Sequence, residues 1–176
     1  MRSTAYKLKI EDLIRGRYVR SAEGEPSRLV TPWGQEALRA HLIATVVDKF
    51  IREDGGYASL RLDDGSETIR AKSWGEDVER MKEFEVGDLV EFIGRVREYE
   101  GEVHLVPEVL KRVEDPNWEL VRELEILQAR RKLVAEGKRP KPRIEAKPRA
   151  GGRELGAERE MGAVEELEEA PLPGVS

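Results

Sequence analysis

Residues 57–74 read YASLRLDDGSETIRAKSW, in which two alternating runs flank the turn sequence Asp63-Asp64-Gly65. Side chains along a strand point to opposite faces in turn, so one face of this pair is mostly apolar: Ala58, Leu60, Leu62, Ile69, Ala71 and Ser73. The other face carries polar, basic and aromatic side chains: Tyr57, Ser59, Arg61, Thr68, Arg70, Lys72 and Trp74. The stretch therefore predicts a β-hairpin with one buried face and one face turned to solvent.

Three further β runs flank this hairpin within residues 41–113. HLIATVVDKF (residues 41–50) precedes it, and GDLVEFIGRVREYEG (87–101) and EVHLVPEVL (102–110) follow it. A short helix is predicted at EDVERMKEF (76–84), between the third and fourth runs. Five short strands with one helix between the third and fourth is the order of an OB-fold, a small Greek-key barrel. We therefore expect an all-β core, a five-stranded OB-fold barrel, over residues 38–113.

The segments on either side of the barrel have different expected roles. Residues 1–37 are predicted to form an N-terminal extension with a strand-like run, a helical turn and a turn at Thr31–Gly34, with Trp33 packing on the barrel. A helix is predicted from Asp115 to about Glu136, since Asp115 suits an N-cap, Pro116 the first turn and Gly137 the end. One apolar stripe on this helix predicts a subunit interface: Leu120, Val121, Leu124, Leu127 and Val134. Residues 138–176 are predicted to be a disordered tail, first basic and then acidic.

Composition excludes several classes of protein. The 176-residue chain has no cysteine, which rules out disulfides, thiolate metal sites and a cysteine nucleophile. His41 and His104 are far apart, and no Gly-rich phosphate loop, HExxH or GxSxG motif occurs, so we expect no metal, no cofactor and no enzyme. No signal peptide or membrane span is evident, which favours a cytoplasmic, nucleoid-associated location. The abundance of Lys, Arg and Glu favours a thermophilic source.

The charge distribution matters more for binding than the net charge of −5. Residues 138–149 carry six basic side chains against Glu145, and residues 150–176 carry two basic against seven acidic groups. Residues 1–137 therefore hold a net charge of −5 as well. Binding to nucleic acid would need a local basic face on an acidic body.

Single-stranded nucleic acid is held by aromatic rings that stack on bases and by cations that follow the phosphates. The outward residues of the hairpin offer both, together with one tyrosine near the last turn; the candidate contact residues are Trp74, Tyr99, Tyr57, Arg61, Arg70 and Lys72. Trp74 has two interpretations, because an outward tryptophan either stacks on a base or is covered by protein. Arg70 and Lys72 either contact phosphate or are ordinary solvated strand residues.

Several phrases, in their order and spacing, resemble the small and middle subunits of archaeal replication protein A. They are KIEDLIRGRYV, TPWG, ATVVDKF, YASLRLDDGSETIRAKSW, GDLVEFIGRVREYEG and DPNWELVREL, and they extend from Lys7 to about Leu127. The resemblance implies a single-stranded DNA-binding OB-fold in replication, repair and recombination, with Trp74 and Tyr99 as stacking aromatics. It also implies that the C-terminal helix joins helices of sister subunits in a heterotrimer. Many members of that family continue into a winged-helix domain, which the residues after Gly137 do not resemble, so docking of replication or repair partners is left to the tail or lost.

Three functions remain open on the sequence alone. The first is a single-stranded DNA-binding subunit. The second is a structural subunit that holds an assembly together while another chain carries most of the DNA affinity. The third is an RNA-binding OB module, because a fold does not fix a function and nothing in the sequence obviously reads a 2′-hydroxyl.

Overall fold

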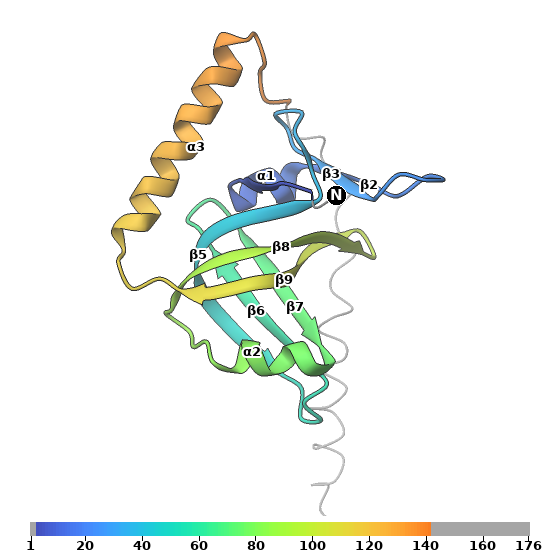
Figure 1. The fold of residues 1–176 in the computed structure, drawn as a ribbon, viewed down its shortest axis with the longest axis vertical. Helices are drawn as coiled ribbons and strands as arrows, with labels where there is room; N and C mark the ends of the chain where they lie inside the picture. Colours follow the sequence, from blue (N-terminus) through green and yellow to red (C-terminus); the bar gives the residue numbers. More distant parts are fainter. Residues whose placement is uncertain (1–2, 142–176) are drawn as a thin grey trace, which may run out of the picture. The chain divides into compact units, whose positions relative to one another are not determined.

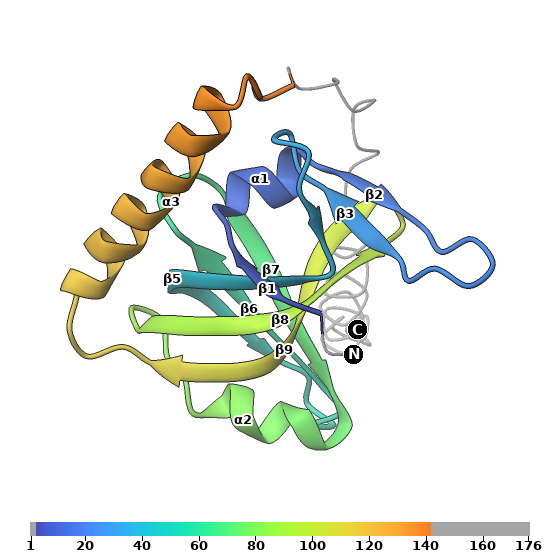
Figure 2. The same ribbon diagram turned by 45° about the horizontal axis from the view of Figure 1, so that its top comes forward.

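A computed structural model describes residues 3–141 of the chain, and five of its strands close into a barrel (Figures 1 and 2). The strands are β5 (Arg39–Ile51), β6 (Tyr57–Asp63), β7 (Thr68–Trp74), β8 (Leu89–Tyr99) and β9 (Glu102–Arg112). They are ordered β5-β6-β7-β9-β8, and β5 pairs again with β8 to close the sheet. The β7–β9 pair is parallel, through Ala71 and Leu105, and the other barrel pairs are antiparallel. This is the OB-fold that the order of β runs predicts.

The alternation of apolar residues explains which face of the sheet forms the core. The predicted inward side chains of β6 and β7 are all buried, and the core continues through Val46, Phe92 and Leu105. Two predicted outward residues, Ser59 and Lys72, are nevertheless buried, at 2% and 5% exposure. They are cross-strand partners, and Ser59 accepts a hydrogen bond from Arg70 at 3.4 Å. The alternation of the strands therefore does not by itself decide which outward side chains are exposed.

Turn residues fix the register of the hairpins. Between β8 and β9 the chain turns through Glu100 and Gly101, whose φ values of 50° and 80° are both positive. Two successive positive φ values define the tight turn whose twist matches that of the flanking strands. In β8, Gly94 lies where β9 approaches closely, since an added Cβ would lie 2.3 Å from the carbonyl oxygen of Val106. The two strands keep one register from the Gly94–Pro107 pair to the Tyr99–Glu102 pair, and the register shifts between Ile93 and Gly94.

The predicted helix between the third and fourth strands is present. It consists of a short 3₁₀ turn, η1 (Gly75–Asp77), followed by α2 (Val78–Lys82). Val78, Met81 and Phe84 are buried in the core cluster, so this segment closes one end of the barrel.

The N-terminal extension is integral to the barrel. Strand β1 (Ala5–Lys7) pairs in parallel with β5, and helix α1 (Ile10–Arg15) buries Ile10 and Leu13 completely. The β6–β7 loop caps α1, because Asp64 Oδ2 accepts a hydrogen bond from the Ile10 backbone N–H at 2.8 Å. The strand and helical turn expected near the N-terminus are both confirmed.

A three-stranded sheet follows α1, and the sequence did not predict it. It contains β2 (Arg17–Val19), β3 (Arg28–Val30) and β4 (Glu36–Ala37). It lies beside the β8–β9 hairpin (Figure 2), and Arg20 pairs with Glu98 at 3.3 Å. The turn at Thr31–Gly34 is present, but Trp33 packs under the guanidinium of Arg130 in the C-terminal helix, 5.4 Å from the ring centre. The expectation that Trp33 packs on the barrel therefore needs correction.

The C-terminal helix α3 (Asn117–Ala135) has well-defined ends. The sequence predicts Asp115 as the N-cap residue, whereas the N-cap position is held by Pro116. Asp115 nevertheless caps the helix, because its Oδ1 accepts a hydrogen bond from the Asn117 N–H at 2.9 Å. At the other end Gly137 has a φ of 80°, and the Lys138 N–H donates to the Leu133 carbonyl at 2.9 Å. This is the Schellman arrangement, in which glycine is favoured, and it confirms the predicted end of the helix.

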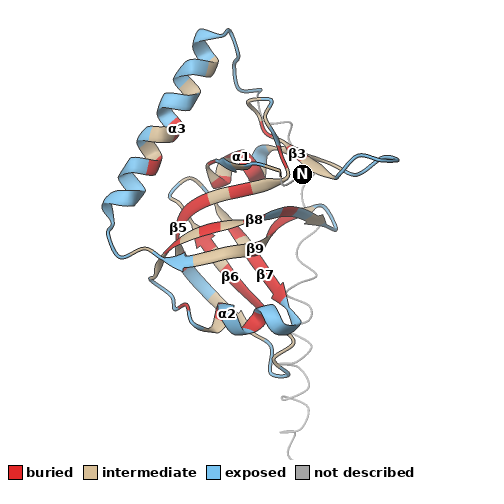
Figure 3. Cartoon of the chain, in the orientation of Figure 1, coloured by how far each residue is buried: buried red, intermediate tan, exposed pale blue. Residues whose placement is uncertain are grey.

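Helix α3 contacts the rest of the fold through the face that carries Arg122, Ile126 and Arg130, called here its charged face. Figure 3 shows that most of the helix is exposed. Arg130 donates to both carboxylate oxygens of Asp12 at 2.9 Å, and Arg122 donates to the His41 carbonyl at 2.8 Å. Arg122 and Ile126 are the buried residues of the helix. All five residues of the predicted stripe are exposed to solvent, among them Leu120 at 60%, Leu124 at 57% and Leu127 at 50%. The barrel covers the side of α3 opposite to its apolar stripe.

The surface on which α3 docks includes His41, whose protonation makes part of the stability of the fold depend on pH. Its Nε2 lies 2.7 Å from Glu91 Oε1 and 3.1 Å from Arg122 Nη2. Burial lowers the pKa of His41; the hydrogen bond that Glu91 accepts from the ring opposes this, and the charges of Arg122 and Lys7 lower the pKa further. Because the pKa is lower in the folded chain, the unfolded chain takes up the proton first as the pH falls. The contribution of neutral His41 is therefore complete above about pH 6.5 and is lost below it.

We therefore expect acid to destabilise the wild type more than a His41→Gln variant. Urea unfolding at about pH 7.5 and about pH 5.5 measures this directly, as the loss of unfolding free energy between the two conditions. Groups that do not interact with His41 titrate alike in both proteins, so the difference between the two losses belongs to His41 and to the carboxylates that interact with it, Glu91 and Glu125. Equal losses would show that His41 does not contribute.

Candidate nucleic-acid interface

Four rings form a continuous row across the outer face of the barrel. Phe50 and Tyr57 have ring centres 6.1 Å apart, and Tyr57 and Trp74 have centres 5.6 Å apart. Trp74 then meets His104 edge-on at 6.2 Å. The rings come from β5, β6, β7 and β9 in turn, so the barrel closure itself places them in line. Trp74 remains 50% exposed.

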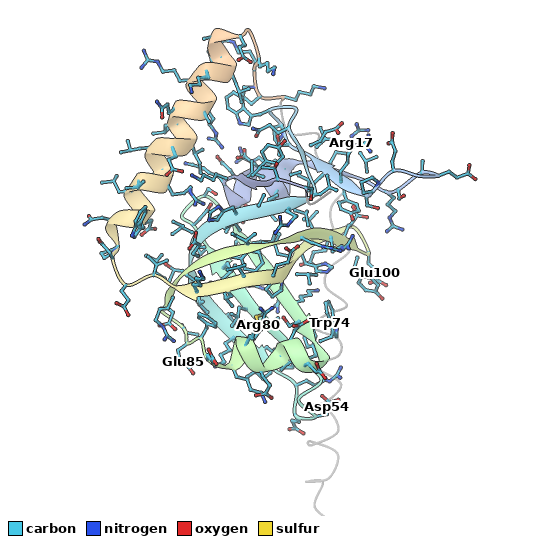
Figure 4. All side chains as sticks on the ribbon, in the orientation of Figure 1. Arg17, Asp54, Trp74, Arg80, Glu85 and Glu100 are labelled. Atoms are coloured by element: carbon cyan, nitrogen blue, oxygen red, sulfur yellow. The ribbon has the colours of Figure 1, made fainter. Side chains whose placement is uncertain are left out.

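Trp74 is thus neither buried nor isolated. Figure 4 shows it at the end of β7, clear of the N-terminal extension and of α3. Among the described residues, the aromatic partners of Trp74 are Tyr57 and His104. Contacts with these two rings hold the indole, while half of its surface is free to meet a flat, apolar ligand.

Tyr99 lies apart from this row, at the end of β8. It is 64% exposed and makes no ring contact with any described aromatic residue. It precedes Glu100, which Figure 4 labels at the tip of the β8–β9 hairpin. Tyr99 and Glu102 are cross-strand partners, and so are Arg97 and His104. Because paired residues share a face of the sheet, Tyr99 lies on the same outer face as His104.

The predicted cations do not all reach the surface. Arg61 and Arg70 are cross-strand partners and are both partly exposed on the outer face. Arg70 is also held by its hydrogen bond to Ser59. Lys72, which the alternation placed toward solvent, is buried, so the expectation of an open phosphate contact at Lys72 is wrong. The structure places Tyr57 and Trp74 together and brings Arg61 beside Arg70, whereas Tyr99 stands on a separate hairpin.

Sequence reasoning missed three residues of this face. Phe50 is not among the predicted contact residues, and His104 enters the sequence analysis only in the argument against a metal site. Arg97 was not singled out, although GRVREYEG alternates and places Arg95, Arg97 and Tyr99 on one face of β8. That alternation was a usable signal. The contact between His104 and Trp74, by contrast, depends on the β7–β9 pairing, which joins residues distant in sequence.

The loop between β5 and β6 carries an ion pair near the row. Arg52 Nε lies 2.7 Å from Asp54 Oδ1. The hydrogen bond from Arg52 lowers the pKa of Asp54, with a second bond from the Gly56 N–H acting in the same direction. Asp54 therefore stays charged at neutral pH and balances Arg52. With Glu53 between them, residues 52–54 carry one net negative charge.

Two other classes of site are absent from residues 3–141. No group of three or more His, Asp or Glu side chains between residues 3 and 141 is arranged to hold a metal ion. No helix in that same range is both long enough and apolar enough to cross a membrane.

The barrel and its outer face define a class of protein. Residues 41–113 match the family model described as the OB-fold nucleic acid binding domain. Fold and family model therefore agree that these residues form an OB-fold. A search of curated protein sequences finds no match.

Solved structures with the same fold include subunits of two kinds of complex. One, described as a replication protein A heterotrimer bound to single-stranded DNA, is 15% identical, covers 74% of this chain and 98% of its own, and has a TM-score of 0.59. A chain of yeast replication protein A bound to single-stranded DNA is 21% identical, with coverages of 72% and 89% and a TM-score of 0.57. A chain of the Schizosaccharomyces pombe Stn1–Ten1 complex is 18% identical, with coverages of 76% and 96% and a TM-score of 0.65. At these identities the similarity establishes the fold.

Proposed function

We propose that this chain is a single-stranded DNA-binding subunit of a complex like archaeal replication protein A, and not an enzyme. The observation that carries the proposal is the row of four rings, with Trp74 half exposed between Tyr57 and His104. Bases have flat faces that stack on such rings regardless of sequence, at about 1–3 kcal/mol per base. A duplex buries its base faces in the stack and cannot use them.

Similarity of fold supports the same proposal. Two of the matching structures are of replication protein A bound to single-stranded DNA. In both, the match extends over nearly the whole of the other chain, so it includes more than a barrel. We infer that Tyr99 supplies a second stacking ring from the β8–β9 hairpin, and that Arg61 and Arg70 contact phosphates.

We further propose that α3 joins this chain to other subunits. Its stripe of five apolar side chains faces solvent, while its charged face binds the barrel. Exposing such a stripe is costly in water, at about 1.5–3 kcal/mol for each side chain that could instead be buried. Contact of this stripe with helices of sister subunits would remove that cost. Any partner contact by residues 142–176 lies outside the described part of the chain.

A structural subunit is the second candidate, and one observation favours it. Several cations around the barrel are already balanced by carboxylates: Arg52 by Asp54, Lys49 by Glu85 and Arg112 by Asp88. In that case α3 would hold the assembly while another chain supplied most of the affinity. An RNA-binding module is the third candidate.

Titration of the full chain with single-stranded DNA, duplex DNA and RNA over a range of salt concentrations separates these candidates. We expect single-stranded DNA to bind best, with little sequence preference. If about three to five phosphates are contacted, log affinity should fall against log salt with a slope of about −2 to −3.5.

The alternatives have different signatures in the same titration. Weak, salt-independent binding by the chain, with strong binding only when partner subunits are added, would identify a structural subunit. Tighter binding to RNA than to DNA of the same sequence would identify an RNA-binding module. Tighter binding to duplex than to single strands would contradict base stacking altogether.

A further inference from the structure

Between the rings of Trp74 and Tyr99 the outer face of the barrel carries one exposed arginine, Arg97. It is the cross-strand partner of His104, whose ring contacts Trp74 at 6.2 Å. It also lies two residues before Tyr99 on the same face of β8, which corresponds to about 7 Å along the strand. Arg97 therefore lies between the two places at which a base can stack.

The charge of Arg97 is not balanced by a carboxylate. Among the described residues it forms no ion pair, and it is exposed. Arg95, on the same face of the same strand, differs in this respect, because its Nε lies 3.3 Å from Glu108, which also binds Arg39. The adjacent carboxylate of Glu98 faces the other way and pairs with Arg20 at 3.3 Å. The local arrangement thus leaves one guanidinium directed to solvent beside the row of rings.

We propose that Arg97 binds the backbone phosphate between the base stacked on Trp74 and the base stacked on Tyr99. This inference rests on the proposed function, and it names a contact residue of that same interface. Two bases that stack on separate rings draw a charged backbone across the surface between them. A guanidinium bonds to phosphate oxygens through two parallel N–H groups, so an unpaired arginine at this point suits that backbone.

The cross-strand neighbour of Arg97 strengthens the argument. His104 is 7% exposed and packs edge-on against Trp74. His104 therefore helps to fix the orientation of the Trp74 indole, and it lies opposite Arg97 in the β8–β9 pair. Ring and cation are held by one rigid piece of sheet, so a phosphate bound by Arg97 lies at a fixed offset from a base stacked on Trp74.

The test compares Arg97→Gln with Lys111→Gln. Both changes remove one positive charge from an exposed side chain of the β8–β9 pair, but Lys111 is seven residues from His104 along β9, about 23 Å away. We expect Arg97→Gln to weaken binding of a short single-stranded oligonucleotide about three- to tenfold and to reduce the steepness of the salt dependence by about 0.7. Lys111→Gln should change both quantities much less, and Arg97→Lys should restore the salt dependence. The melting temperature of each variant checks that the barrel stays folded.

A second measurement locates the phosphate. Oligonucleotides in which one phosphate at a time is replaced by an uncharged methylphosphonate should show one position that weakens binding to the wild type but not to Arg97→Gln. Equal effects of Arg97→Gln and Lys111→Gln, or a wild-type and variant profile that match at every position, would overturn the inference. Failure of the wild type to bind single strands would instead overturn the proposed function, so the two failures are distinguishable.

Discussion

Replacing Trp74 by alanine should weaken binding of single-stranded DNA by about 1–3 kcal/mol, which is about five- to 150-fold in Kd. The indole is half exposed and contacts Tyr57 and His104, so its removal takes away a stacking surface but opens no cavity in the core. The barrel should therefore melt close to the wild-type temperature. Fluorescence anisotropy with a labelled oligonucleotide measures the affinity, and circular dichroism measures the melting.

Trp118→Ala is the matched control for this variant. Trp118 lies on α3 and is 55% exposed, close to the 50% of Trp74, but it is not part of the row of rings. We expect it to leave the affinity of the isolated chain unchanged. If Trp74→Ala instead lowers the melting temperature and leaves affinity unchanged, Trp74 is a packing residue and the stacking role is excluded.

Leu124→Asp should abolish assembly with partner subunits while the barrel keeps its fold. Leu124 lies in the middle of the stripe, 57% exposed in the single chain. Burying an unpaired carboxylate between helices costs several kcal/mol, in addition to about 1.5–3 kcal/mol of lost apolar burial. Light scattering or sedimentation of the chain mixed with candidate sister subunits measures the assembly.

Ala129→Asp introduces the same carboxylate five residues further along α3, at an exposed position about 140° around the helix from Leu124 and off the stripe. We expect it to leave the assembly largely intact. Two outcomes would contradict the assembly role of α3. One is a wild-type chain that stays monomeric with every replication protein A-like subunit offered, and the other is a Leu124→Asp variant whose barrel unfolds. Either would make α3 an internal brace.

Local patterns account for the parts of the fold that could be predicted. Alternation in 57–74 placed the inward residues of β6 and β7 correctly, because a strand repeats every two residues. Asp63-Asp64-Gly65 and Glu100-Gly101 marked the hairpins through their backbone preferences. Gly137 marked the end of α3 in the same way. Each of these signals is contained within a few residues.

The rest depended on contacts between distant segments. Strands β2, β3 and β4 have only two or three residues each, too few for alternation to appear. The contact of His104 with Trp74 follows from the pairing of β7 with β9, and the burial of Lys72 is not visible in the alternation of its own strand. The apolar stripe of α3 was visible, but which face the barrel would cover was not, since arginines and glutamates provide the docking contacts.

The way in which α3 is attached determines how a complex would be oriented. Only four residues, 113–116, link the end of β9 to the helix, and Arg122 and Arg130 anchor its charged face to His41 and Asp12. The short linker and these contacts therefore hold the helix in a fixed orientation relative to the barrel, so that the two move as one rigid body. A subunit that binds the apolar stripe of α3 would therefore find the barrel in one orientation relative to that stripe. The linker between β9 and α3, together with the contacts of Arg122 and Arg130, would then determine the path of a DNA strand from one subunit to the next.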